Sequence, residues 1–125
     1  MIVWDKKRRG LDQADCEIAW TNLKGQNRIF EYKWNGMLQQ NMKEKEVRIH
    51  ATQKPVDLYC YLYMLTGLKS RDKILDPYLG SGSSRIAAYN MGFDFYGYEI
   101  NKTYFDLQEE RFQNHIAQQN LFLMS

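Results

Sequence analysis

Proline, cysteine and histidine are scarce in this sequence, which holds two of each among its 125 residues. Cys16 and Cys60 both stand beside apolar residues, and neither belongs to a metal-binding spacing. This argues against a disulfide scaffold or a zinc site, and we expect two buried free thiols. A signal peptide, a long apolar run, internal repeats and low-complexity segments are also missing, so we expect a soluble, cytoplasmic protein.

A strong charge of either sign is missing too, since the net charge is only +2. A charge this small permits contact with nucleic acid without arguing for it. The apolar content, 44% of residues, is enough for folding, and the length predicts a single small domain over residues 1–125. A strand signal opens the chain at residues 1–4, which suggests that an N-terminal part is missing.

The most informative stretch is residues 73–84, with the sequence KILDPYLGSGSS. A short apolar run ends on Asp76, a Gly-Ser-Gly turn follows at residues 80–82, and a helical pattern begins at Ser83. This order predicts a strand, a tight turn and a helix. Glycine lets the backbone approach a ligand closely, and a helix N-terminus offers free N–H groups to an electronegative one.

A second strand is predicted at residues 93–98, and it leads into another acid, Glu99. The separation of Asp76 and Glu99 is about that at which nucleotide-binding folds place the acid that binds ribose hydroxyls. The pattern is therefore typical of a half-site for an adenosine-type cofactor. The alternative is a strand–helix–strand unit whose glycine turn binds nothing, since short motifs give false positives.

Periodicity and capping signals predict the other elements. Alternation indicates strands at residues 16–20 and 28–32, joined by a loop. We expect a helix over Val56–Leu65, with Thr52 as its cap and Pro55 in its first turn.

Two further helices are predicted, from Ser83 to Asn90 and over residues 101–118 with Asn101 as the cap, and an apolar tail follows at residues 121–124. The buried stripe expected for the long helix is Tyr104, Leu107, Phe112 and Ile116.

Several polar and aromatic stretches have two interpretations. The basic turn at residues 5–10 is a solvated loop or a phosphate contact. Residues 39–48 form an exposed loop or a poor helix, which in a nucleic-acid enzyme could face the substrate. Trp34 and Met37 are expected to pack in the core or a loop rather than to stack on bases. His50 has no serine, cysteine or paired carboxylate placed to complete a triad, so we interpret it as structural.

Three motifs in the chain carry a family resemblance: HATQKP at residues 50–55, ILDPYLGSGSS at 74–84 and GYEI at 97–100. With WDK at residues 4–6 and CEIAWT at 16–21, they resemble the C-terminal half of S-adenosylmethionine-dependent DNA amino-methyltransferases, which methylate adenine N6 or cytosine N4. The class is the one whose target-amine motif comes first and cofactor motif last. The resemblance implies an α/β, Rossmann-like methyltransferase fold, N-terminally truncated, with a mixed sheet flanked by helices.

The resemblance also implies roles for the matching residues. Asp76 would lie near the methionine amino group, Glu99 would accept hydrogen bonds from the ribose hydroxyls, and the 52–54 segment would meet the methionine carboxylate. A lysine and hydroxyl donors suit such an anion. The cofactor-binding residues implied are Thr52, Gln53, Lys54, Asp76, Pro77, Tyr78, Gly80, Ser81, Gly82 and Glu99.

The sequence departs from the family at two places. Ala51 stands where the family usually has proline, and no Asp-Pro-Pro-Tyr type tetrad precedes the strand at residues 2–4. That tetrad holds the target amine, so we expect no methyl transfer and weak DNA contact by this chain alone. The chain is then a split subunit completed by another chain, an inactive module that binds cofactor or DNA, or a decayed bacterial or phage fragment.

A missing tetrad strand would leave the strand that ends in Asp76 with an unpaired edge. Unpaired backbone groups cannot stay buried without partners, and a long apolar edge invites another chain. The two groups of strands would either close up directly or be joined through a second copy, and we favour a homodimer formed by strand pairing or exchange.

Overall fold

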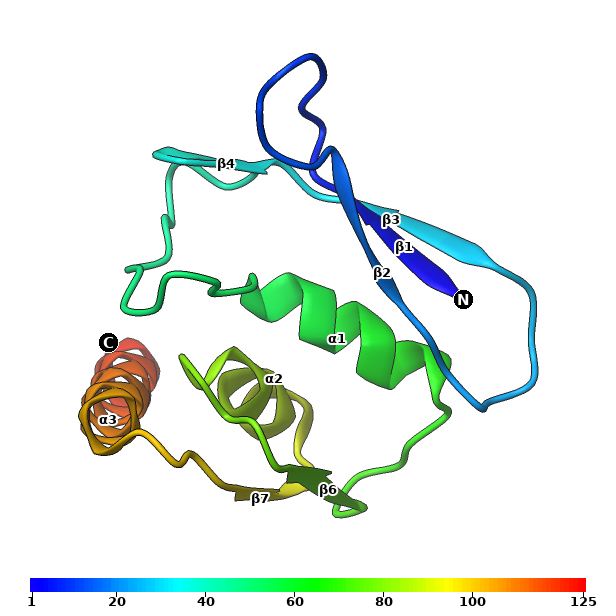
Figure 1. The fold of residues 1–125 in the computed structure, drawn as a ribbon. Coiled ribbons are helices and arrows are strands. Elements are labelled where there is room, and N and C mark those ends of the chain that lie inside the picture. The colour runs from blue at the N-terminus through cyan, green and yellow to red at the C-terminus, as the bar shows by residue number, and fades with distance from the viewer. The chain divides into compact units, whose positions relative to one another are not determined.

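The computed structural model describes all of residues 1–125 and divides into two compact units, Met1–Glu46 and Val47–Ser125. Figure 1 labels the helices and strands of both units. The first unit holds only strands, and the second holds the three helices and a parallel strand pair. None of these helices has the combined length and hydrophobicity that a membrane crossing requires.

The first unit is built on a three-stranded sheet. Its strands are β1 (Ile2–Asp5), β2 (Cys16–Ala19) and β3 (Arg28–Glu31), in the order β2-β1-β3. The β1 strand is antiparallel to β2 and parallel to β3. The two strands predicted at 16–20 and 28–32 are confirmed, but they do not pair with each other, because β1 lies between them.

Aromatic packing holds the end of this sheet. Trp4 is buried, and its indole N–H donates to the carbonyl of Tyr32 at 3.1 Å. Trp34 is also buried and opens a short antiparallel pair, β4 (Trp34–Asn35) and β5 (Leu38–Gln39). The core role predicted for Trp34 is confirmed, whereas Met37 is exposed at the turn between these strands.

The second unit places helices on one side of a two-stranded sheet. Strands β6 (Lys73–Asp76) and β7 (Asp94–Gly97) pair in parallel, and α2 (Ser83–Met91) connects them. In Figure 1, α1 (Val56–Leu65) and α2 lie on the same side of this pair. The helix predicted at Val56–Leu65 is confirmed, but Pro55 rather than Thr52 occupies the N-cap position, without a side-chain cap.

Helix α2 and helix α3 (Lys102–Met124) begin in different ways. Gly82 is the N-cap of α2 and Gly92 is its C-cap. Both are in the left-handed conformation, which glycine adopts without a steric penalty. Helix α3 starts at Asn101, whose side chain accepts from the N–H of Tyr104 at 3.1 Å, as predicted. The expected apolar tail continues this helix to Met124.

The core of the second unit lies between its helices and the sheet. Its buried apolar side chains are Leu58, Leu79, Ile86, Ala87, Ala88 and Phe112. Tyr63 closes this core by donating from its hydroxyl to the carbonyl of Ser84 at 3.1 Å, and burial raises the pKa of this phenol. Both cysteines are free, and each is half-buried rather than buried as expected.

Candidate functional site

The two parallel strands of the second unit end side by side, and the glycine loop (residues 77–82) leaves from there. Asp76 pairs in register with Gly97, and the N–H of Tyr98 donates to the carbonyl of Asp76 at 2.9 Å. The N–H of Leu79 donates back to the carbonyl of Tyr98 at 2.8 Å. The glycine loop is therefore attached to the segment that carries Glu99.

Glu99 is held by two backbone donors. Its Oε1 accepts from the N–H of Gly80 at 3.0 Å, and its Oε2 accepts from the N–H of Asn101 at 2.9 Å. These bonds, that of Asn101 first, hold the pKa of this carboxyl below its usual 4.5. Each carboxylate oxygen has about two lone-pair sites, so the ionised group keeps acceptor capacity beyond these two bonds.

Asp76 is positioned in a similar way at the start of the loop. Its Oδ1 accepts from the N–H of Tyr78 at 2.9 Å, and its Oδ2 accepts from the hydroxyl of Ser84 at 2.5 Å. The structure thus brings Asp76 and Glu99 to the same end of the sheet, joined through the glycine loop. Pro77 and Tyr78 of this loop are exposed.

The two glycines of the loop have different surroundings. Gly80 has a φ of +55°, and a Cβ added there would meet nothing closer than 3.9 Å, where the ring of His50 lies. Gly82 has a φ of +79°, and a Cβ there would lie 3.2 Å from the side chain of Gln108. A side chain at Gly80 would therefore be accommodated without crowding, while the missing side chain at Gly82 allows α3 to approach the loop.

Helix α3 secures the other end of the glycine loop. The guanidinium Nη1 of Arg111 donates to the carbonyl of Ser81 at 3.0 Å and to the hydroxyl of Ser83 at 2.9 Å. Gln108 is fully buried; its amide donates to the carbonyl of Phe105 at 2.9 Å and accepts from Arg85 at 3.2 Å. Sequence reasoning missed this pair, although two polar side chains beside the predicted apolar stripe were a signal.

The HATQKP segment reaches the loop through its first residue. Thr52 is exposed and bonds to Nδ1 of His50, while Lys54 is half-buried. Gln53 is buried, with its amide accepting from the N–H of Ile49 at 2.8 Å and donating to the carbonyl of Val47 at 3.0 Å. Of this segment, it is His50 that lies within 4.0 Å of the Cβ position on Gly80.

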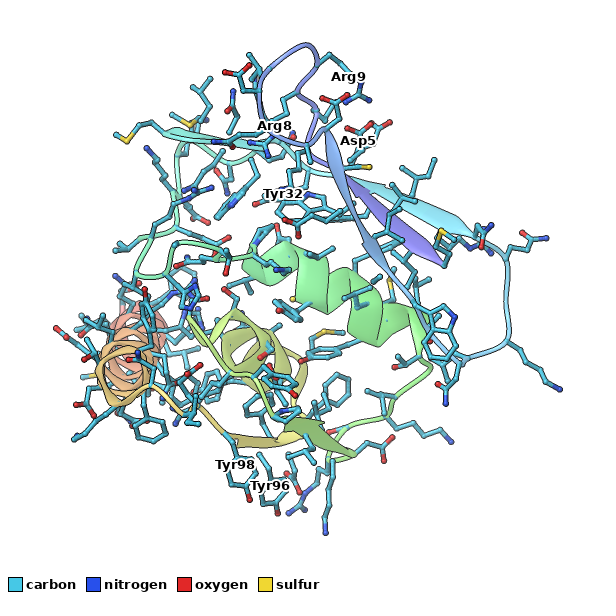
Figure 2. All side chains as sticks on the ribbon, in the orientation of Figure 1. Asp5, Arg8, Arg9, Tyr32, Tyr96 and Tyr98 are labelled. Atoms are coloured by element: carbon cyan, nitrogen blue, oxygen red, sulfur yellow. The ribbon has the colours of Figure 1, made fainter.

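The basic turn of the first unit is more ordered than a solvated loop. Lys6 and Arg8 are buried; Lys6 pairs with Glu17 at 2.8 Å, and Arg8 donates to the carbonyl of Ala14 at 2.9 Å. Arg9 pairs with Asp5 and lowers the pKa of that carboxyl to about 2. Figure 2 shows these arginines beside the strands. The solvated interpretation is therefore wrong for Lys6 and Arg8.

A groove of about 400 Å³ lies beside the free edge of β7, between α2 and α3. Its lining includes Arg85, whose guanidinium lies 3.7 Å from the centre of the Phe112 ring and pairs with Glu109 at 2.6 Å. Neither Asp76, Glu99 nor the glycine loop lines this groove, so it is separate from the candidate site.

Comparison with solved structures bears on the fold. The chain resembles the crystal structure of the M1.HpyAVI–SAM complex with a TM-score of 0.55 and 23% sequence identity, over 89% of this chain and 60% of that one. The expected α/β, Rossmann-like methyltransferase fold is thereby confirmed.

Sequence comparison bears on the family. Relatives include the type II methyltransferase M.HinfI of Haemophilus influenzae, 35% identical over 68 residues, which are 54% of this chain and 19% of that protein. M.MthZI of Methanothermobacter thermautotrophicus is 30% identical over 106 residues, 85% of this chain and 26% of that protein. The chain thus spans about a fifth to a quarter of the length of these curated relatives. Residues 2–110 match the N6/N4 methyltransferase family described as DNA methylase, and the chain belongs to this family.

Proposed function

We propose that this chain binds S-adenosylmethionine at the Asp76–Glu99 site, as the cofactor-binding part of a DNA amino-methyltransferase acting on adenine N6 or cytosine N4. The observation that carries this is the carboxylate of Glu99, oriented by the N–H groups of Gly80 and Asn101 with lone pairs left for hydroxyl donors. A ribose offers two such hydroxyls on neighbouring carbons. Gly80 has no side chain, so its backbone would allow the close approach of a nucleoside.

The other residues implied by the family resemblance have compatible chemistry. Asp76 is an acceptor for the methionine ammonium group, and Lys54 is a donor for its carboxylate. In this proposal Ser81 and Gly82 would shape the loop beneath the ligand, and Thr52, Gln53, Pro77 and Tyr78 would complete its surroundings, as the family resemblance implies. The bound cofactor supplies a methyl group on a sulfonium, and the chain's own residues orient it.

A second candidate function is an inactive or split subunit that binds cofactor and needs a partner chain for catalysis. The sequence observation that favours it is that the two prolines, Pro55 and Pro77, leave no Asp-Pro-Pro-Tyr type tetrad among the 125 residues. An exocyclic amine must be held by acceptors outside the base stack before transfer. We infer that this chain alone transfers no methyl group and contacts DNA weakly, in a salt-sensitive way.

Isothermal calorimetry with S-adenosylhomocysteine tests the binding site. We expect weak but measurable binding, which Glu99→Gln should reduce by about tenfold or more, because hydrogen bonds to a charged group are worth about 1.5–3 kcal/mol. Glu110→Gln, which changes an exposed acid of α3, is the matched control and should bind as the parent does. The absence of binding at millimolar ligand would contradict the proposal.

A labelled-methyl assay separates the two candidate functions. Purified chain is incubated with DNA and S-adenosylmethionine that carries a labelled methyl group. Incorporation that Asp76→Ala abolishes would show that the chain is a complete enzyme. No incorporation, together with calorimetric binding, would support the subunit or inactive-module function.

A further inference from the structure

The tip of the glycine loop is a tight turn over residues 79–82. The N–H of Gly82 donates to the carbonyl of Leu79 at 2.9 Å, and Gly80, with a φ of +55°, occupies the second position of the turn. This hydrogen bond joins two peptide groups, the one between Leu79 and Gly80 and the one between Ser81 and Gly82. Each of them has a further polar group that binds outside the turn.

Both of these outer polar groups bind charged side chains. The guanidinium Nη1 of Arg111, from α3, donates to the carbonyl of Ser81 at 3.0 Å. The N–H of Gly80 donates to Oε1 of Glu99 at 3.0 Å. Three hydrogen bonds in series, at 3.0, 2.9 and 3.0 Å, thus connect a guanidinium to a carboxylate through two peptide groups, and we call this series the peptide relay.

All three bonds of the peptide relay run in the same direction. Arg111 donates to the first peptide group, that group donates to the second, and the second donates to the carboxylate. Hydrogen bonds in such a chain polarise one another, which strengthens each by about 10–30%. A cation at the donor end and an anion at the acceptor end favour this polarisation. Leu79, Ser81 and Gly82 are buried, so water competes little with the middle of the relay.

We propose that Arg111 is a positioning residue of the Asp76–Glu99 site, and that it strengthens the hydrogen bond from Gly80 to Glu99 through the peptide relay. One oxygen of the carboxylate is thereby fixed, and the group faces a ligand in one orientation. This inference rests on the proposed function for the identity of the ligand. The relay itself is a property of the free protein and can be tested without any ligand.

Carbon NMR of the free 125-residue protein tests the peptide relay, by following the carboxyl carbon of Glu99 through a pH titration. In the parent the N–H groups of Asn101 and Gly80 hold the pKa of this carboxyl below its usual 4.5. In Arg111→Met this pKa should rise toward 4.5, because the bond from Gly80 is weaker. His50, whose charge also lowers this pKa, is unchanged in the variant. An unchanged pKa in the folded variant would overturn the inference.

Two further variants keep this test decisive. Arg111→Gln retains an N–H donor and removes the charge, so it should also raise the pKa of Glu99, and it replaces Arg111→Met if that variant does not fold. Arg85→Met is the matched control, because Arg85 donates to Gln108 and Glu109 of α3. It should leave the pKa of Glu99 as in the parent. An equal rise in this control would show a general effect of lost charge and would overturn the relay.

Adenosine titrations connect the peptide relay with ligand binding. We expect Arg111→Met to bind adenosine about two- to fourfold more weakly than the parent, because the carboxylate is held less firmly. In the background of Glu99→Gln, which lacks the charged end of the relay, the same substitution should cause a smaller loss. Losses that are equal in the two backgrounds would show that Arg111 does not act through Glu99.

The outcomes separate this inference from the proposed function. If the parent binds no adenosine at millimolar concentration, the proposed function fails, while a raised pKa of Glu99 in Arg111→Met would still establish the peptide relay. If the parent binds adenosine and the pKa of Glu99 does not respond to Arg111, the relay fails and the proposed function stands.

Discussion

Gly80 and Gly82 both have positive φ values, yet their side-chain positions face different neighbours. A Cβ on Gly80 would make ordinary van der Waals contact with the ring of His50 at 3.9 Å, whereas a Cβ on Gly82 would crowd Gln108 of α3 at 3.2 Å. We therefore expect a substitution at Gly80 to act on the proposed ligand binding and one at Gly82 to act on stability. Single substitutions can separate these two roles.

Gly82→Ala should destabilise the protein by more than Gly67→Ala. Both glycines have φ between +70° and +80°, so both substitutions carry the cost of about 1–2 kcal/mol for a side chain in the left-handed region. Only at Gly82 does the new Cβ also crowd Gln108, at 3.2 Å, while Gly67 has open space. Urea denaturation of the two variants measures the difference, and equal destabilisation would contradict the contact.

The carboxylate of Glu99 predicts a pH dependence of stability. Its folded pKa is depressed by the N–H groups of Asn101 and Gly80, so the stabilising contribution is complete above the ordinary value of 4.5 and is lost as the pH falls through the lower folded value. Glu99→Gln should therefore have a lower urea midpoint than the parent at pH 7. The gap should close in acid below pH 4.5. A gap that stays constant down to pH 3 would contradict this, and Glu110→Gln is the control.

At the scale of elements, side chains of helix α3 hold the glycine loop in place, although α3 lies outside the strand–helix–strand unit. It supplies Arg111, which holds Ser81 and Ser83, and Gln108, which packs on Gly82. Order in the loop should depend on the docking of this helix.

Arg111→Met tests this dependence. The substitution keeps an unbranched apolar stem and removes a charged donor to Ser81 and Ser83, so we expect a loss of about 1.5–3 kcal/mol in the free energy of unfolding. Lys102→Met on the same helix removes an exposed ion pair with Asp106 and should change stability by less than about 0.5 kcal/mol. Chemical denaturation compares the two, and a larger effect at Lys102 would show that the loop does not depend on Arg111.

The elements of residues 73–99 could be predicted because their signals are local. The short apolar run, the glycines of the turn and the acid after each strand lie within a few residues of the elements that they predict, and the same holds for Asn101 as the cap of the helix that follows. The order β2-β1-β3 could not be predicted in this way, since the sequence of β1 does not specify which strands pair with it. Thr52 resembled a helix cap, but its partner is His50, two residues earlier.

The candidate site, too, could be predicted from the sequence only in part. Asp76 and Glu99 could be placed together because parallel strands end at one edge of a sheet. The contribution of Gln108 and Arg111 depends on how helix α3, which begins at Lys102, packs on the loop, and periodicity alone does not describe that packing. The interpretation of His50 as structural agrees with its packing on Tyr104 and its hydrogen bond from the N–H of Thr52.

For the whole molecule, one face of the β6–β7 sheet carries side chains that are exposed to solvent. Leu75 and Tyr96 pair in register and are 64% and 53% exposed, and Tyr98 on the same strand side is 66% exposed. Figure 2 shows Tyr96 and Tyr98 pointing away from the helices. Strand β6 pairs with β7 along one edge only, and its opposite edge carries unpaired backbone groups.

We expect the isolated protein to self-associate through this face and edge, as the dimer favoured from the sequence requires. Sedimentation velocity should show a mass that rises with protein concentration. The double substitution of Leu75 and Tyr96 by lysine should suppress this, because charged side chains protect sheet edges and faces. Met37→Lys, at an exposed turn of the other unit, is the control. A compact monomer at all micromolar concentrations would contradict dimer formation.

The hydrogen bonds that define the Asp76–Glu99 site, including the His50 and Arg111 contacts, all lie within the second unit. A circular permutation that moves residues 1–46 behind α3 would therefore cut none of them. Loops such as residues 40–45, exposed along their length, are where chains tolerate new ends. We therefore expect such a rearrangement of the gene to leave the proposed cofactor half-site intact, because it lies within one uninterrupted segment.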